Sequence, residues 1–157
     1  MSRVFRGAVA ALALVAAVPA AAQDLGALSW LVGRWQGTGT MFGAASEAAL
    51  DIRPALGGKF LELSYRGGGG FEGRAFYRPV ETGGWQAQWF DNRGVTFGIS
   101  GRVEGQVLTA DWGSVETERG RTVYRLMPDG RLEVTDTVAT RDGGSREFAR
   151  HVLTRAE

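Results

Sequence analysis

The only histidine of the chain, His151, is the residue with the most versatile chemistry. A neutral imidazole inside a protein can ligate iron or act as a base. Cysteine is absent, so thiolate nucleophiles, redox pairs and thiolate metal sites are excluded. A Ser-His-Asp triad would have to use His151, and no serine lies in a G-x-S-x-G motif. His151 is therefore an iron ligand or a base if it faces inward, and a solvated residue if it faces outward.

Acidic side chains are the next candidates for chemistry. Glu62 or Asp111 could act as the carboxylate of a hydrolase or isomerase, but no motif supports this, and binding is favoured over catalysis. Asp91 lies in a turn sequence, where aspartate accepts backbone hydrogen bonds. Asp136 shares a face with two valines, which predicts a buried carboxylate paired with an arginine or an exposed one. The polar side chains that could point inward are Glu62, Gln86, Gln88, Asp91, Asp111 and Asp136.

Aromatic residues are the candidates for the wall of a ligand pocket, although each would also suit an ordinary core. Gly37 and Gly39 leave one face of a strand bare, which indicates either space for a ligand or a tight bend. Trp35 lies on the same face, and we expect it to plug one end of the protein beneath the guanidinium of Arg155 or Arg150. The pocket candidates are Tyr65, Trp85, Trp89, Phe97 and Trp112.

The elements that position these residues are almost all strands. Residues 25–32 predict a short helix with Asp24 as its N-cap and Gly33 after its end. Such a short helix must lie against an apolar surface to be stable. Farther along, glycine-rich turns separate short alternating segments. Ten strands are expected, at residues 34–40, 46–53, 59–66, 71–78, 84–91, 94–101, 106–112, 120–127, 131–138 and 146–155.

The predicted fold is all-β, an antiparallel up-and-down β-barrel of about ten strands with one short N-terminal helix. The alternating strands need one buried and one exposed face. Tight turns between successive strands favour a closed barrel, because closure removes exposed edges. About eight strands already leave a filled or ligand-sized interior, so about ten predict a cavity.

A G-x-W-x-G motif stands at Gly33-Arg34-Trp35-Gln36-Gly37. It resembles the first-strand signature of lipocalins and other calycins. The segments that follow it are, in order, Leu56-Gly57-Gly58-Lys59-Phe60-Leu61, Phe71-Glu72-Gly73, Trp85 to Asp91 with Gly94, and Leu153-Thr154-Arg155. The series is similar to a family of bacterial exported proteins of unknown function with a lipocalin-like ten-stranded barrel. This resemblance spans about Leu28 to Arg155 and implies a fold without implying a reaction.

A more distant resemblance is to the haem-binding nitrobindin-like barrels. They share a G-x-W-x-G-x-G opening, which corresponds here to Gly33, Trp35, Gly37 and Gly39. The resemblance implies that His151 would be the iron ligand, since those proteins use a single histidine near the C-terminus. The intervening segments differ, and residues 54–61 follow the exported family instead.

The first residues predict a secretory signal peptide. Arg3 and Arg6 precede an apolar run and small residues, so we expect cleavage after Ala22. The run of about ten apolar residues is too short for the ~20 that span a bilayer. The expected organisation is a signal peptide at 1–22 and one barrel domain at 23–157, in the periplasm or secreted. Without Arg3 and Arg6, the 18 basic residues become 16 against 17 acidic ones, which gives no reason to expect a nucleic-acid partner.

These observations predict a monomeric, exported barrel that binds a small apolar or amphipathic molecule in its interior and needs no cofactor. One alternative is a haem protein that uses His151 as its iron ligand. Another is an interaction or structural module that uses its outer face and binds no ligand. We expect no membrane span in the mature chain.

Overall fold

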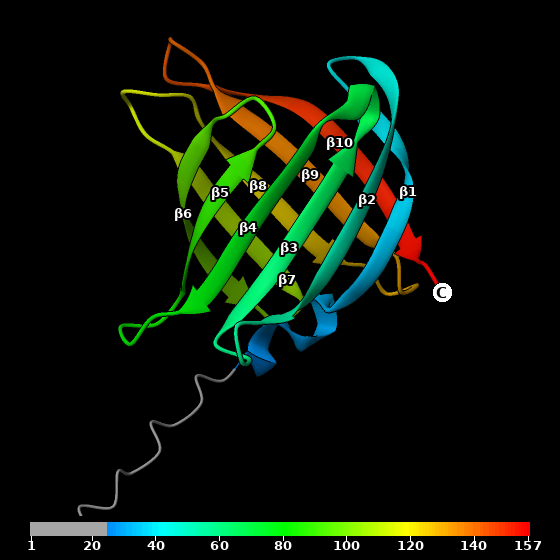
Figure 1. The fold of residues 1–157 in the computed structure, drawn as a ribbon. Helices are drawn as coiled ribbons and strands as arrows, with labels where there is room; N and C mark the ends of the chain where they lie inside the picture. Colours follow the sequence, from blue (N-terminus) through cyan, green and yellow to red (C-terminus); the bar gives the residue numbers. More distant parts are fainter. Residues whose placement is uncertain (1–24) are drawn as a thin grey trace, which may run out of the picture.

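The computed structural model describes residues 25–157, which form a closed barrel of ten antiparallel strands (Figure 1). Successive strands pair along the chain, and β10 pairs with β1 to close the barrel. This confirms the predicted all-β, ten-stranded, up-and-down barrel. The strands are β1 (Gly33–Met41), β2 (Ala44–Ala55), β3 (Phe60–Gly67), β4 (Glu72–Pro79), β5 (Trp85–Asp91), β6 (Thr96–Glu104), β7 (Val107–Gly113), β8 (Arg119–Leu126), β9 (Leu132–Ala139) and β10 (Ser145–Arg155).

The strand boundaries differ from the prediction by up to three residues, the largest difference being at the end of β6, and two differences have a clear cause in a turn. β2 begins at Ala44 because Phe42 and Gly43 both have positive φ and form a two-residue turn between the paired Met41 and Ala44. β6 begins at Thr96 because the amide of Gly94 closes a turn on the carbonyl of Asp91. The predicted signal peptide at 1–22 lies outside the described residues.

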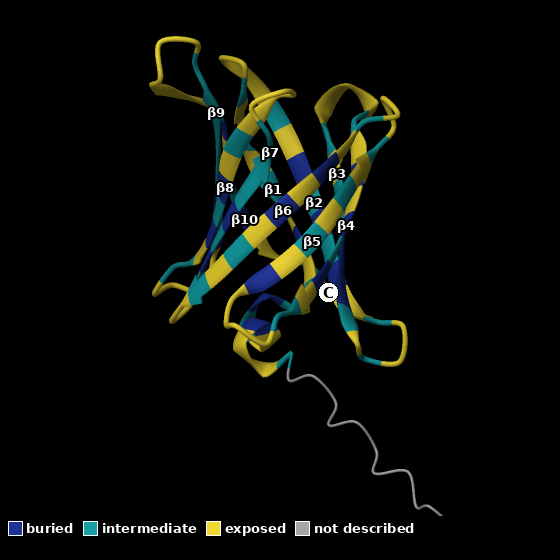
Figure 2. Cartoon of the chain, turned by 90° about the vertical axis from the view of Figure 1, so that its left-hand side faces the viewer, coloured by how far each residue is buried: buried dark blue, intermediate teal, exposed yellow. Residues whose placement is uncertain are grey.

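Side-chain alternation sorts each strand into an inner and an outer face, and Figure 2 shows the resulting bands of buried and exposed residues. On β10, the inner face carries Ala149, His151 and Leu153, all of which are buried. The strand register places these three opposite inward positions of β1 and β9. His151 therefore faces the interior of the barrel, the orientation that the sequence left open.

A short helix, η1 (Gly26–Leu31), lies at one end of the barrel, and the β1–β2, β7–β8 and β9–β10 turns lie at the other (Figure 1). It is a 3-10 helix of six residues, shorter than the helix expected at residues 25–32. No side chain makes a capping hydrogen bond at its N-terminus. The expected cap, Asp24, lies outside the described residues. Leu28 and Leu31 are completely buried against the strands, which explains how so short a helix persists.

The second 3-10 segment, η2 (Gly68–Gly70), is a glycine turn between β3 and β4. Within the described part of the chain, no helix has the length and apolar character needed to cross a bilayer.

Candidate functional site

Trp35 seals the end of the barrel that η1 covers. Its ring is 1% exposed, and its Nε1–H donates to the carbonyl of Leu31 at 2.9 Å. The guanidinium carbon of Arg155 lies 4.2 Å from the centre of the ring. The same guanidinium donates to the carbonyls of Trp30 and Val32, at 2.9 and 2.8 Å. Arg155 thus ties η1, the indole and the last strand together.

Arg150, the other arginine considered for this position, lies on the outer wall. Its guanidinium pairs with Glu133 at 2.8 Å and with Glu147 at 2.7 Å. The alternation of β10 decides between the two arginines, because Arg155 shares the inner register with Trp35 and Arg150 does not.

Gly37 and Gly39 face inward beside β10. A Cβ atom at Gly37 would clash with the backbone of Val152 and Leu153, and one at Gly39 would clash with the backbone of Arg150 and His151. This close approach of two strands agrees with the tight-bend interpretation of the bare face. Ligand contact at these two glycines stays a prediction.

His151 is 1% exposed, and its Nε2 has no hydrogen-bond partner. Burial lowers the pKa of the imidazole, because the charged form loses its hydration. The side chain is therefore a neutral imidazole with one unused ring nitrogen inside the barrel. Among the described residues, no group of three or more histidines and carboxylates could hold a metal ion with it.

Asp136 is the inward carboxylate of β9. Its Oδ1 accepts a hydrogen bond from Thr122 Oγ1 at 2.5 Å, and the same hydroxyl accepts from Trp112 Nε1 at 3.2 Å. None of the ion pairs among the described residues includes Asp136, so the arginine expected beside a buried Asp136 is not there. Desolvation raises the pKa of this carboxyl to about 6, against the lowering effect of Thr122.

Three tyrosines share the interior with Asp136. Burial raises the pKa of Tyr65 to about 12, and the negative charge of Asp136 adds to the shift. Burial also raises the pKa of Tyr77, with Asp136 as the next cause, and that of Tyr124, with Tyr77 and then Asp136 as the next causes. At neutral pH all three are therefore neutral phenols, able to donate hydrogen bonds into the barrel.

Half-buried aromatic rings surround the end of the barrel opposite η1. Trp89 and Trp112 face inward in register yet remain partly exposed. Phe97 lies 5.5 Å from Trp112, and Phe71 lies 6.4 Å from Trp89 between ring centres. A bulge in β10 next to Phe148 brings that ring within 6.5 Å of Trp112. Because solvent reaches inward-facing rings at this end, we call it the open end.

The fifth pocket candidate, Trp85, lies away from the open end. It stands at the opposite end of β5 and is buried in the core cluster. Asp91, at the open end of the same strand, accepts from Trp89 Nε1 at 3.1 Å and pairs with Arg93 at 2.8 Å. Asp91 is therefore already paired with a positively charged side chain, that of Arg93.

The other polar residues expected inside point outward instead. Leu61 and Leu63 occupy the inner face of β3, so alternation turns Glu62 to the outer wall. There it is held between Arg53 at 3.2 Å and Arg74 at 3.6 Å. The prediction that Glu62 points inward was wrong, and the same correction applies to Gln86, Gln88 and Asp111.

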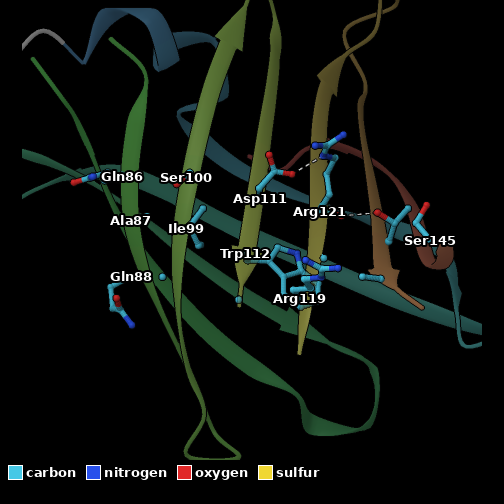
Figure 3. Close-up of a pocket in the computed structure, with 15 residues that line it drawn as sticks. Gln86, Ala87, Gln88, Ile99, Ser100, Asp111, Trp112, Arg119, Arg121 and Ser145 are labelled. Carbon is cyan, nitrogen blue, oxygen red and sulfur yellow. Dashed lines mark hydrogen bonds and ion pairs between the residues drawn. The ribbon is translucent and has the colours of Figure 1, made fainter. Parts of the chain in front are cut away.

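The outer wall of β5 to β9 forms a groove of about 820 Å³ (Figure 3). Gln86, Gln88 and Ser100 line one side, and Asp111 pairs with Arg121 at 2.5 Å across the other. A second hollow of the same volume lies on the outer wall of β1 to β5. These grooves are polar and open, unlike the aromatic interior.

Several interior residues were not singled out as site candidates from the sequence. Thr122, Tyr77 and Tyr124 occupy inner positions by simple alternation, so that signal was available. Phe71 and Phe148 lie in a turn and at a bulge, where alternation gives no guidance. The polar chain of Trp112, Thr122 and Asp136 joins three consecutive strands, β7, β8 and β9, through a register that alternation along one strand does not give.

No protein-family model matches this chain, and no curated protein matches it either. The fold and the site define a closed ten-stranded antiparallel β-barrel with one end sealed by Trp35 and η1, an architecture compatible with a lipocalin-like barrel.

Proposed function

We propose that this barrel binds a small amphipathic molecule, which enters through its open end. The observation that carries the proposal is the partial exposure of inward-facing Tyr65, Trp89 and Trp112 at that end. Apolar sites with a few convergent polar groups are the usual binding sites of proteins. Asp136 and the three tyrosines supply the polar groups, and the rings supply the apolar wall.

The rings would account for most of the affinity. A ligand that buries about 200 Å² of apolar surface gains about 5 kcal/mol at about 25 cal/mol per Å². The fixed side chains of the sealed end would also contribute to the affinity, because a site supported by such side chains loses little conformational freedom when a ligand binds. We also propose that the protein is exported and belongs to the bacterial family that its segments resemble; the N-terminal pattern and the barrel support this.

A neutral hydrophobic dye, N-phenyl-1-naphthylamine, tests the proposal through its increase in fluorescence on binding. Ala87 faces inward at the middle of β5 and is only half-buried, so Ala87→Leu places a larger side chain in the interior. Its matched control is Gly98→Leu on the neighbouring strand, where a Cβ atom would meet nothing within 4 Å on the outer wall. Ala87→Leu should weaken dye binding about tenfold, and Gly98→Leu should leave it unchanged.

The reverse result, with the dye lost in Gly98→Leu and retained in Ala87→Leu, would place binding in the outer groove and overturn the proposal. No dye binding by the wild-type protein would also overturn it and leave the interaction module as the better description. Val138→Phe, at an inward, half-buried position near the open end of β9, repeats the test should Ala87→Leu not fold.

Haem at His151 is the second candidate function. The unpartnered Nε2 of an inward imidazole favours it. The ring is only 1% exposed, however, so a porphyrin would reach it only after neighbouring side chains moved, and the residues as placed do not fit the group. We therefore favour binding of an amphipathic ligand over binding of haem. A Soret band on haem titration that disappears in His151→Ala would reverse this order.

A further inference from the structure

An inward carboxylate of the barrel, that of Asp136, forms no ion pair with any residue that the structure describes. Two acidic side chains face inward in the described strands, Asp91 and Asp136. Asp91 pairs with Arg93 at 2.8 Å, whereas Asp136 has only the hydroxyl of Thr122. A half-buried carboxylate that has no opposite charge beside it is partly desolvated at a cost, and a bound cation would reduce that cost.

The surroundings of Asp136 suit an organic cation better than a metal ion. Metal ions of the carboxylate-binding kind take several oxygen ligands. Here one carboxylate stands beside neutral hydroxyls, and the described residues contain no cluster of three or more metal-ligating side chains around it. An ammonium group needs only one carboxylate, and hydroxyl oxygens such as that of Thr122 can serve as further acceptors.

Aromatic faces lie beside the same carboxylate. Trp112 connects to it through Thr122, with Nε1 to Oγ1 at 3.2 Å and Oγ1 to Oδ1 at 2.5 Å. The rings of Phe97 and Phe148 lie 5.5 and 6.5 Å from Trp112. Aromatic faces attract cations, and the attraction grows where water is excluded. Both sources of cation affinity thus converge on one side of the open end.

We propose that the ligand of the barrel is an amine, whose ammonium group pairs with Asp136 and whose apolar part packs on Trp112, Phe97 and Phe148. The inference rests on the proposed function and specifies the charge of the molecule that enters. In the strand register Asp136 lies one inward position farther from the open end than Trp112, so the charged group leads and the apolar part follows.

The test is a set of three molecules of equal length: octylammonium, octanol and octanoate. Each displaces N-phenyl-1-naphthylamine from the wild-type protein at about pH 7.5, where the amine is charged. Octylammonium should compete about tenfold better than octanol, and octanoate should be the weakest. This comparison requires no variant, so it decides the matter even if a substitution prevents folding.

Two isosteric variants locate the effect. Asp136→Asn should bring octylammonium to within about threefold of octanol while octanol and the dye still bind. Asp111→Asn, on the outer wall between Arg121 and Arg102, should keep the wild-type preference.

Equal competition by octylammonium and octanol in the wild-type protein would overturn the inference and leave the proposed function standing. A preference that survives Asp136→Asn, or that disappears in Asp111→Asn, would overturn it as well, because the cation would then bind elsewhere. Failure of the dye itself to bind would overturn the proposed function, and the inference with it.

Discussion

The two ends of this barrel use the same kinds of side chain for opposite purposes. At the sealed end, Trp35 has its N–H bonded to a backbone carbonyl and its face covered by Arg155. At the open end, Trp112 bonds to Thr122, and through it to Asp136, which has no cation. An indole becomes structural where the chain itself supplies every partner. The binding role proposed for Trp112 depends instead on its partial exposure and on the carboxylate to which Thr122 connects it.

The largest expected effect comes from removing each indole in turn. Trp35→Ala should lower the free energy of unfolding by about 3–5 kcal/mol, because it empties a fully buried position beneath η1. Trp112→Ala should cost about 1–2 kcal/mol, since its ring is already partly exposed to solvent. Urea denaturation followed by circular dichroism measures both. Equal losses would mean that the two ends are equally packed.

The second prediction concerns the arginine on the sealed end. Arg155→Met keeps much of the aliphatic stem and removes the charge over Trp35 and two hydrogen bonds, one to Trp30 in η1 and one to Val32 just after it. We expect a loss of about 2 kcal/mol in the free energy of unfolding. Arg150→Met, on the exposed side of the same strand, is the control and should cost about 0–1 kcal/mol. A larger loss in the control would show that the outer pairs stabilise β10 more than the sealed end does.

The third and smallest effect is a pH dependence at the open end. The pKa of Asp136 is raised from 3.8 to about 6, so the folded protein binds more protons than the unfolded chain between these values, and stability falls as pH rises through that range. Asp136→Asn should therefore stabilise the protein by about 1–2 kcal/mol at about pH 7.5 and by nothing near pH 3.5.

Thermal unfolding of both proteins across this range measures the difference. The lowered pKa of His151 works in the opposite direction, because stability falls as pH drops below its usual 6.5. That contribution is common to both proteins and cancels in the difference. A constant difference at every pH would show that Asp136 is not desolvated.

The barrel could be predicted from the sequence because strand alternation and turn glycines are local signals. Leu61, Leu63 and Tyr65 mark an inner face by themselves, and the Phe42–Gly43 turn fixes where two strands meet. The orientation of His151 could not be predicted in this way, because both faces of β10 carry apolar residues. Only its pairing with β1 and β9 decides the matter.

The contacts within the candidate site were harder to predict, since alternation along one strand does not say which side chains meet across neighbouring strands. Asp136 was recognised as unusual, but its partner is Thr122 on β8 and not an arginine. Glu62 illustrates the opposite case: its neighbours already assign it to the outer wall, where Arg53 and Arg74 hold it. The pattern along one strand therefore predicts whether a side chain faces inward or outward, but it does not predict which residues of other strands that side chain contacts.

The pairing of β1 with β10 has a consequence for how the molecule is made. Trp35 belongs to the first strand and Arg155 to the last, so the seam joins residues from opposite ends of the domain. Contacts so distant along the chain form late and slowly. The indole that seals the barrel therefore lacks the cover of Arg155 until the chain has been synthesised as far as that residue and β10 has paired with β1.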